Sequence, residues 1–96
     1  MEMLNPPHPG LVVKGELEEL QVPVAEAAKS LGVTRQQLYR VLRGDCGITA
    51  DMAWRLERAI GGSARLWLSM QATYDLAQLR KRKPQPKVRK LVVRAA

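Results

Sequence analysis

Apolar residues recur every three to four positions in five short segments of the chain, a period that predicts amphipathic helices. The first segment covers residues 11–20, and its predicted buried stripe consists of Val13, Leu17 and Leu20. Pro23 restarts the chain, and a second helix is predicted from there to Gly32, a residue suited to a C-terminal cap. The stripe of this second helix consists of Val24, Ala27, Ala28 and Leu31.

The remaining three helices are each introduced by a hydroxyl side chain that can accept a hydrogen bond from the first turn. Thr34, Thr49 and Ser63 occupy these cap positions. The fifth helix is expected to end at or before Lys83, because prolines follow it. The predicted buried stripes are Leu38, Val41 and Leu42, then Met52, Leu56 and Ile60, then Trp67, Met70, Tyr74 and Ala77.

Length and composition indicate a single all-α domain with five short helices. The chain has 96 residues, contains no Phe, and is rich in Ala, Leu, Glu, Gln and Arg in its middle part. A chain of this size buries only about two thirds of its unfolded surface, so the core is modest. We expect an N-terminal lead-in over residues 1–10, the helical domain over 11–82 and a tail over 83–96.

The positive charge of the chain is concentrated at its C-terminal end. The net charge is +7, but residues 1–79 hold eight basic and nine acidic residues, whereas residues 80–96 hold eight basic and no acidic ones. The tail also contains β-branched apolar residues, so a strand, an arm and a disordered segment all fit its composition. A basic tail favours phosphate binding, although solubility and disorder explain such tails almost as often.

The residue inventory excludes several classes of function. Cys46 is the only cysteine, which excludes an internal disulfide and suits a reducing cytoplasm. No apolar run approaches the roughly 20 residues of a membrane span. His8 is the only histidine, so we expect it to pack or to form a hydrogen bond near the N-terminus and expect no metal site. Because a nucleophile–histidine–acid set and a glycine-rich phosphate loop are also missing, we expect neither an enzyme nor a cofactor.

Residues 24–43 have the pattern of a helix-turn-helix. Such a turn needs a glycine and an apolar residue at its corner, and Gly32 and Val33 supply them. The exposed face of the second helix consists of Arg35, Gln36, Gln37, Tyr39, Arg40 and Arg43. Glutamine can bind adenine and arginine can bind guanine, and each pair adds about 1–3 kcal/mol of discrimination. A merely solvated face is the alternative, but the alanine-rich helix and the Leu-Gly-Val turn before it favour DNA recognition.

Four motifs occur in order within residues 5–79, namely NPPHPG, LGVTRQQLYRVLRG, ITADMAWRLERAIG and WLSMQATYDL. Together they resemble the HigA-type antitoxins, a branch of the λ-repressor-like (XRE) helix-turn-helix proteins. The resemblance implies a five-helix repressor-like fold, binding to operator DNA, repression of the chain's own operon and partnership with a RelE/HigB-like mRNA-cleaving toxin. It places base contacts at Arg35, Gln36, Gln37, Tyr39 and Arg40. It also places a phosphate contact at Thr34, and we expect Arg43 to contact phosphate as well.

Two positions depart from the pattern of that family. Pro23 stands where a Ser or Thr cap is usual, so the second helix is expected to begin differently. Ala64-Arg65 replaces the usual Pro-Glu after Ser63, which weakens that cap. Nothing about the tail beyond Arg80 can be carried over from the family.

A homodimer is expected, because one recognition helix covers too few base pairs for genomic specificity. Its interface is predicted on the fifth helix and the segment after it, at Leu79, Leu91, Val92 and Val93. Trp67 and Tyr74 are expected in the core or at this interface. The acidic residues Glu16, Glu18 and Glu19 form a solvated face or contact the toxin. The alternative function is a stand-alone XRE-type repressor without a toxin partner.

Overall fold

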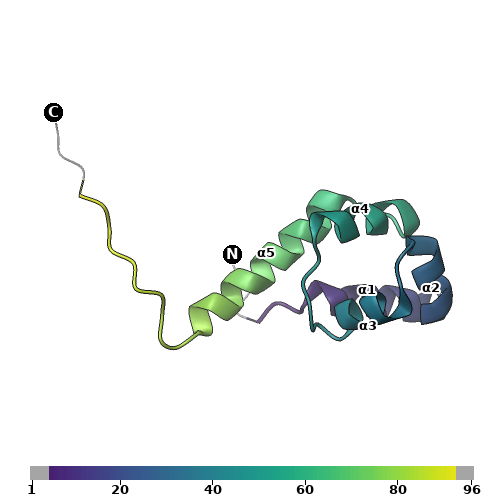
Figure 1. The fold of residues 1–96 in the computed structure, drawn as a ribbon, viewed down its shortest axis with the longest axis horizontal. Helices are drawn as coiled ribbons and strands as arrows, with labels where there is room; N and C mark the ends of the chain where they lie inside the picture. The colour runs from purple at the N-terminus through teal and green to yellow at the C-terminus, as the bar shows by residue number, and fades with distance from the viewer. Residues whose placement is uncertain (1–4, 93–96) are drawn as a thin grey trace.

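The computed structural model describes residues 5–92, and within that range it contains five helices and no strand (Figure 1). The helices are α1 (Pro9–Glu19), α2 (Val24–Leu31), α3 (Arg35–Leu42), α4 (Ala50–Ala59) and α5 (Ala64–Lys81). The predicted all-α fold with five helices is confirmed. No helix in the described part is both long and apolar enough to span a bilayer.

The caps predicted for the last three helices form as expected. Thr34 Oγ1 accepts a hydrogen bond from the Gln37 amide at 3.1 Å, and Thr49 Oγ1 accepts one from the Met52 amide at 3.2 Å. The Ser63 hydroxyl accepts a bond from the Leu66 amide at 3.0 Å, so the unusual residues after Ser63 leave this cap intact. Pro23 precedes α2 and, as expected, provides no side-chain cap there.

The start of α1 and the role of Leu20 differ from the prediction. The helix begins at Pro9, two residues earlier than residue 11, because the Nδ1 atom of His8 accepts the Gly10 amide at 2.9 Å and caps the first turn. Leu20 was predicted in the buried stripe, but it is 57% exposed. It follows the last helical residue, and the chain then turns so that Val22 packs against the core instead.

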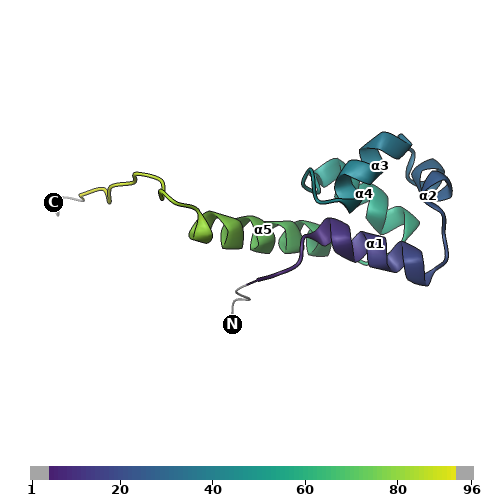
Figure 2. The ribbon, with the colours of Figure 1, turned by 90° about the horizontal axis from the view of Figure 1, so that it is seen from below.

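The core lies between α1, α2, α3, α4 and the first half of α5. Its buried apolar residues from the five helices are Val13, Leu17, Ala27, Ala28, Leu31, Leu38, Val41, Leu42, Met52, Ala53, Leu56 and Trp67. Ile48, from the loop before α4, completes it. The second half of α5 extends beyond the other helices, and the tail continues away from them (Figures 1 and 2).

The end of α5 makes contacts with both terminal segments of the chain. Gln85 folds back, and its Nε2 atom donates to the carbonyl groups of Leu79, Arg80 and Arg82 at 2.7–3.1 Å. The ammonium group of Lys81 donates to the side chain of Asn5. The predicted end of α5 before Lys83 is confirmed, because the helix stops at Lys81.

The first turn of α1 lies directly against the backbone of α3, and only glycine fits at the contact. A Cβ atom added to Gly10 would lie 1.8 Å from the carbonyl oxygen of Val41. Gly15, one and a half turns further along α1, would meet nothing within 4 Å. The distance between α1 and α3 is therefore set by the absence of a side chain at Gly10.

We expect Gly10→Ala to lower the free energy of unfolding by about 1–3 kcal/mol or more, because the added methyl group forces α1 away from α3. Gly15→Ala is the matched control, and it should raise the free energy of unfolding by about 0.5–1 kcal/mol, since alanine is the better helix former. Urea denaturation of both variants measures this. Equal stabilities would contradict the close contact at Gly10.

Candidate nucleic-acid interface

Helix α3 buries one face and exposes the other. Leu38, Val41 and Leu42 are buried in the core, as predicted. The residues predicted to bind DNA are all exposed, and they are Thr34, Arg35, Gln36, Gln37, Tyr39, Arg40 and Arg43. The sequence therefore located the exposed surface of α3 correctly, while the roles of its individual side chains stay predictions.

The exposed face of α3 has a centre and two edges. At 3.6 residues per turn, Gln36, Arg40 and Arg43 project most directly away from the buried stripe. Tyr39 lies toward α1, where it lines a groove with Leu11 and other residues. Gln37 lies toward α4, where it and Arg40 line a second hollow that also includes Thr49. The centre of the face is thus a glutamine between two arginines.

Tyr39 and Arg43 interact with each other on this face. The Arg43 guanidinium carbon lies 5.6 Å from the centre of the Tyr39 ring, which is the geometry of a cation–π contact. At an exposed site such a contact contributes about 0.5–1 kcal/mol, enough to restrict the arginine without removing its charge. Arg43 is therefore held against the Tyr39 ring while its N–H groups remain available.

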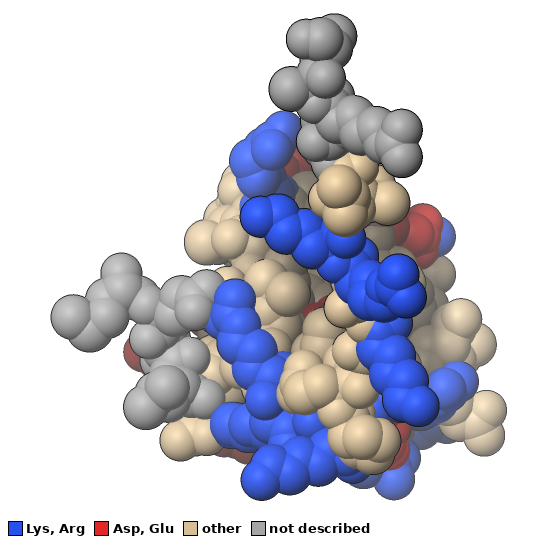
Figure 3. Space-filling view, turned by 90° about the vertical axis from the view of Figure 1, so that its left-hand side faces the viewer, with Lys and Arg blue, Asp and Glu red and all other residues tan. Residues whose placement is uncertain are grey.

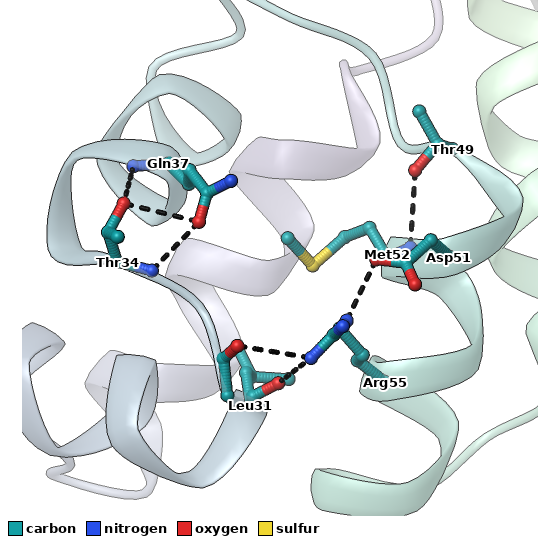
Figure 4. A network of polar contacts seen from close by, with 8 residues as sticks. Leu31, Thr34, Gln37, Thr49, Asp51, Met52 and Arg55 are labelled. Carbon is teal, nitrogen blue, oxygen red and sulfur yellow. Dashed lines mark hydrogen bonds and ion pairs between the residues drawn. The ribbon is translucent and has the colours of Figure 1, made fainter.

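A reciprocal pair of contacts fixes the first turn of α3. Besides accepting the Gln37 amide, Thr34 donates its own backbone N–H to Gln37 Oε1 at 2.9 Å. The Thr34 hydroxyl lies 3.2 Å from the same oxygen (Figure 4). This is a capping box, and it satisfies two backbone donors with two side chains.

Arg55 of α4 holds the turn between α2 and α3 from the other side. Its Nη1 atom donates to the carbonyl oxygens of Leu31 at 2.9 Å and Gly32 at 3.1 Å (Figure 4). Its Nε atom donates to Asp51 at 2.8 Å, which orients the guanidinium group. Gly32 adopts the left-handed conformation predicted for it, with φ of 71°. Sequence reasoning missed Arg55, whose only signal was an acidic residue four positions before it.

The loop between α3 and α4 is anchored to α5 by Gln71, a second residue that sequence reasoning missed. Gln71 is buried, and its Oε1 atom accepts the Ile48 amide at 2.8 Å. Its Nε2 atom donates to Asp75 at 2.9 Å. A Cβ atom at Gly47 would lie 3.2 Å from the Gln71 side chain, so the loop passes close over it. The start of α4 is therefore fixed relative to α5.

The remaining residues singled out in the sequence lie outside the exposed face of α3, although Glu18 lines the groove between α1 and α3 with Tyr39. The side chains of Glu16, Glu18 and Glu19 are exposed on α1. His8 is buried and its ring makes a T-shaped contact with Tyr74, at 4.8 Å between centroids, so the predicted packing role is confirmed. Figure 3 shows lysine and arginine side chains gathered where α5 ends and the tail begins. The structure does not bring this basic tail together with α3 (Figure 2).

Comparison with known proteins identifies the class to which this fold belongs. A helix-turn-helix family model (HTH_3) matches residues 14–67, and the chain belongs to this XRE-type helix-turn-helix family. The chain is 49% identical over 78 residues to virulence-associated protein A' of Dichelobacter nodosus, an alignment that covers 80% of this chain and 68% of that protein.

Two solved structures place the chain beside the HigA antitoxins. It is similar to an addiction module antidote protein of the HigA family from Coxiella burnetii, with a TM-score of 0.77 and 33% identity over 80% of this chain and 85% of that one. It is also similar to the antitoxin HigA of Pseudomonas aeruginosa, solved with the higBA promoter, with a TM-score of 0.73 and 37% identity over 77% and 82% of the two chains. The λ-repressor-like fold and the family resemblance predicted from the sequence are confirmed.

We expect Arg55→Met to lower the free energy of unfolding by about 1–3 kcal/mol, because it removes charged hydrogen bonds to two carbonyl groups of the turn. Asp51→Asn removes only the exposed ion pair and some helix-dipole attraction, so it should lower the free energy of unfolding by less than about 1 kcal/mol. Thermal and urea unfolding of both variants measure the difference. If Asp51→Asn proves as costly as Arg55→Met, the contacts to Leu31 and Gly32 are not what stabilises the turn.

Proposed function

We propose that this protein is a sequence-specific repressor that places α3 in the major groove of operator DNA and also neutralises a toxin encoded beside it. The observation that carries the proposal is the exposed face of α3, which holds three arginines and two glutamines without an acidic residue. Membership of the helix-turn-helix family supports it, as does similarity to an antitoxin solved with promoter DNA.

In this proposal Arg35, Gln36, Gln37, Tyr39 and Arg40 contact base edges and Arg43 contacts a phosphate. A phosphate contact by Thr34 stays a prediction, because its N–H and hydroxyl groups already donate to Gln37. The N-terminal part of a recognition helix normally approaches the bases, which suits the first residues of α3. The side chains of Gln36 and Arg40 have no hydrogen-bond partner within residues 5–92, so their polar groups are free to bind a base. Thr34 and Arg43 lie at the two ends of the helix, where a helix bound in the major groove meets the phosphate backbones of the DNA.

We propose that the protein binds DNA as a homodimer through the outer face of α5. Leu68, Ala72, Leu76 and Leu79 follow one another at spacings of four, four and three residues on the side opposite the buried Trp67. The three leucines are 36–47% exposed, so this stripe is apolar and lacks a cover within the monomer. Leu91 and Val92 are exposed as well, while Val93 lies outside the described residues.

The toxin is proposed to dock outside the exposed face of α3, on the acidic side of α1. Glu16, Glu18 and Glu19 are exposed there, and an mRNA-cleaving toxin must itself be basic to hold RNA. Glu18 lines the groove between α1 and α3 together with Tyr39 and Arg43, whereas Glu16 and Glu19 do not line it, so the proposed toxin surface borders the exposed face of α3.

We expect Leu76→Glu to convert the dimer to a monomer, because it places a charge in the middle of the apolar stripe of α5. The side chain is half exposed in the monomer, so the fold should survive. Sedimentation at micromolar concentration compares it with Thr73→Glu, an exposed position on the same helix outside the stripe. A wild-type chain that remains monomeric both alone and on operator DNA would contradict the proposed dimer.

The test of the proposed function is the double variant Gln36→Ala with Arg40→Ala. Neither side chain contributes to the core, and alanine is a good helix former, so the fold should persist. At about 1–3 kcal/mol for each lost base contact, binding to DNA from the protein's own promoter should weaken by about thirty-fold to more than ten-thousand-fold. Binding to random DNA, which depends on phosphate contacts, should fall much less.

The same folded variant should still bind and neutralise the product of the neighbouring gene. Glu26→Ala with Lys29→Ala, on the exposed side of α2, serves as a matched control for two surface changes. Intact operator affinity in the double variant would contradict the role of α3. Loss of both activities with an unchanged circular dichroism spectrum would mean that toxin and DNA share α3, and failure of the wild-type protein to bind the neighbouring product would favour the stand-alone repressor.

A further inference from the structure

The side-chain amide of Gln37 is held in one orientation by the backbone of Thr34. The Thr34 N–H group donates to Gln37 at 2.9 Å, and only the oxygen of a glutamine amide can accept such a bond. The Thr34 hydroxyl lies 3.2 Å from the same oxygen and donates a second bond to it. Both lone pairs of Oε1 are then occupied, and the amide nitrogen is turned away from Thr34 (Figure 4).

We infer that Gln37 takes part in operator recognition only as a hydrogen-bond donor, so that it selects guanine or thymine at the base it faces. This inference rests on the proposed function of α3. A glutamine reads adenine by donating to N7 and accepting from the N6 amino group at the same time, and Gln37 has no acceptor left for the second bond. Guanine N7 and O6 and thymine O4 accept a donor directly. Adenine N7 accepts only one bond, and its neighbouring amino group repels the second N–H of Gln37, while cytosine presents only an amino donor in the major groove.

The neighbouring glutamine, Gln36, keeps the acceptor that Gln37 has lost. Gln36 is exposed, and within residues 5–92 its amide has no hydrogen-bond partner, so it keeps both a donor and an acceptor. It can therefore bind adenine through two bonds. Two adjacent and chemically identical side chains thus read different bases, because one of them also caps the helix.

The side chains around Gln37 also favour a base that accepts hydrogen bonds. Gln37 and Arg40 line the same hollow between α3 and α4. Arginine is a donor without an acceptor, so the two side chains present donors together. The carboxylate of Asp51 in that lining accepts a bond from Arg55 at 2.8 Å. A base with acceptor groups therefore fits this side of α3 best.

Gln37→Glu tests the inference, because a carboxylate can keep the capping box while it removes the N–H donors. The probe is a pool of DNA duplexes with a randomised core, from which bound sequences are selected and counted. The wild-type protein should enrich guanine or thymine at one position of each half-site. Gln37→Glu should keep the wild-type melting temperature and lose that preference by about three- to tenfold, the effect of one hydrogen bond.

Two further variants separate the donor from the added charge. Gln36→Glu puts the same charge on the same face, and it should weaken a preference for adenine at a different position while the guanine or thymine preference stays. Gln37→Met carries neither charge nor donor, and it should lose the same preference as Gln37→Glu but melt at a lower temperature, because it cannot cap the helix.

Two outcomes would overturn the inference while leaving the proposed function intact. One is a wild-type preference for adenine at the position that depends on Gln37. The other is a base profile of Gln37→Glu that equals the wild-type profile apart from an overall loss of affinity like that of Gln36→Glu. A wild-type protein that enriches no sequence at all would contradict the inference and the proposed function together.

Discussion

The orientation of α3 depends on how the carbonyl groups at the end of α2 are satisfied. The last carbonyl groups of a helix have no hydrogen-bond donors inside the helix. Here a guanidinium group from α4 donates hydrogen bonds to them. Arg55 binds Leu31 and Gly32 at once, so it links the end of α2 and the turn to α4. A Cβ at Gly32 would come within 2.9 Å of that guanidinium, and its φ of 71° also disfavours other residues. The glycine of the turn is therefore required by both its conformation and its neighbour.

Two other contacts fix α3 from the remaining sides. The absence of a side chain at Gly10 lets α1 touch the backbone of α3 near Val41. Gln71 reaches from α5 to the loop that follows α3 and binds the Ile48 amide. Because α1 contacts α3 directly while α4 and α5 hold the segments before and after it, α3 presents its outer side chains on a rigid frame. Such a frame suits recognition, because polar groups on a rigid helix need little reorganisation when they meet a base.

The sequence predicted those features that depend on neighbours close along the chain. Thr34, Thr49 and Ser63 cap helices because the groups they bind lie three residues away. The buried stripes follow from helical period alone, and the prediction for Leu20 was wrong because α1 ends at Glu19 and the chain turns from Leu20 onward. Arg55 and Gln71 could not be predicted, since each binds a backbone group 23 or 24 residues away. Their partners become neighbours only once the helices have packed.

The sequence predicted which side chains are exposed on α3, but not which of their hydrogen-bonding groups remain free. Gln36 and Gln37 are alike in the sequence, and only the capping box distinguishes them. In the proposed function this face meets DNA. The most direct measurement is the change of backbone amide NMR signals when the protein's own promoter DNA is added. The largest changes should fall on residues 34–43, with smaller ones at the start of α4. Changes confined to α1 or to the tail, with the signals of α3 unaltered, would contradict the account.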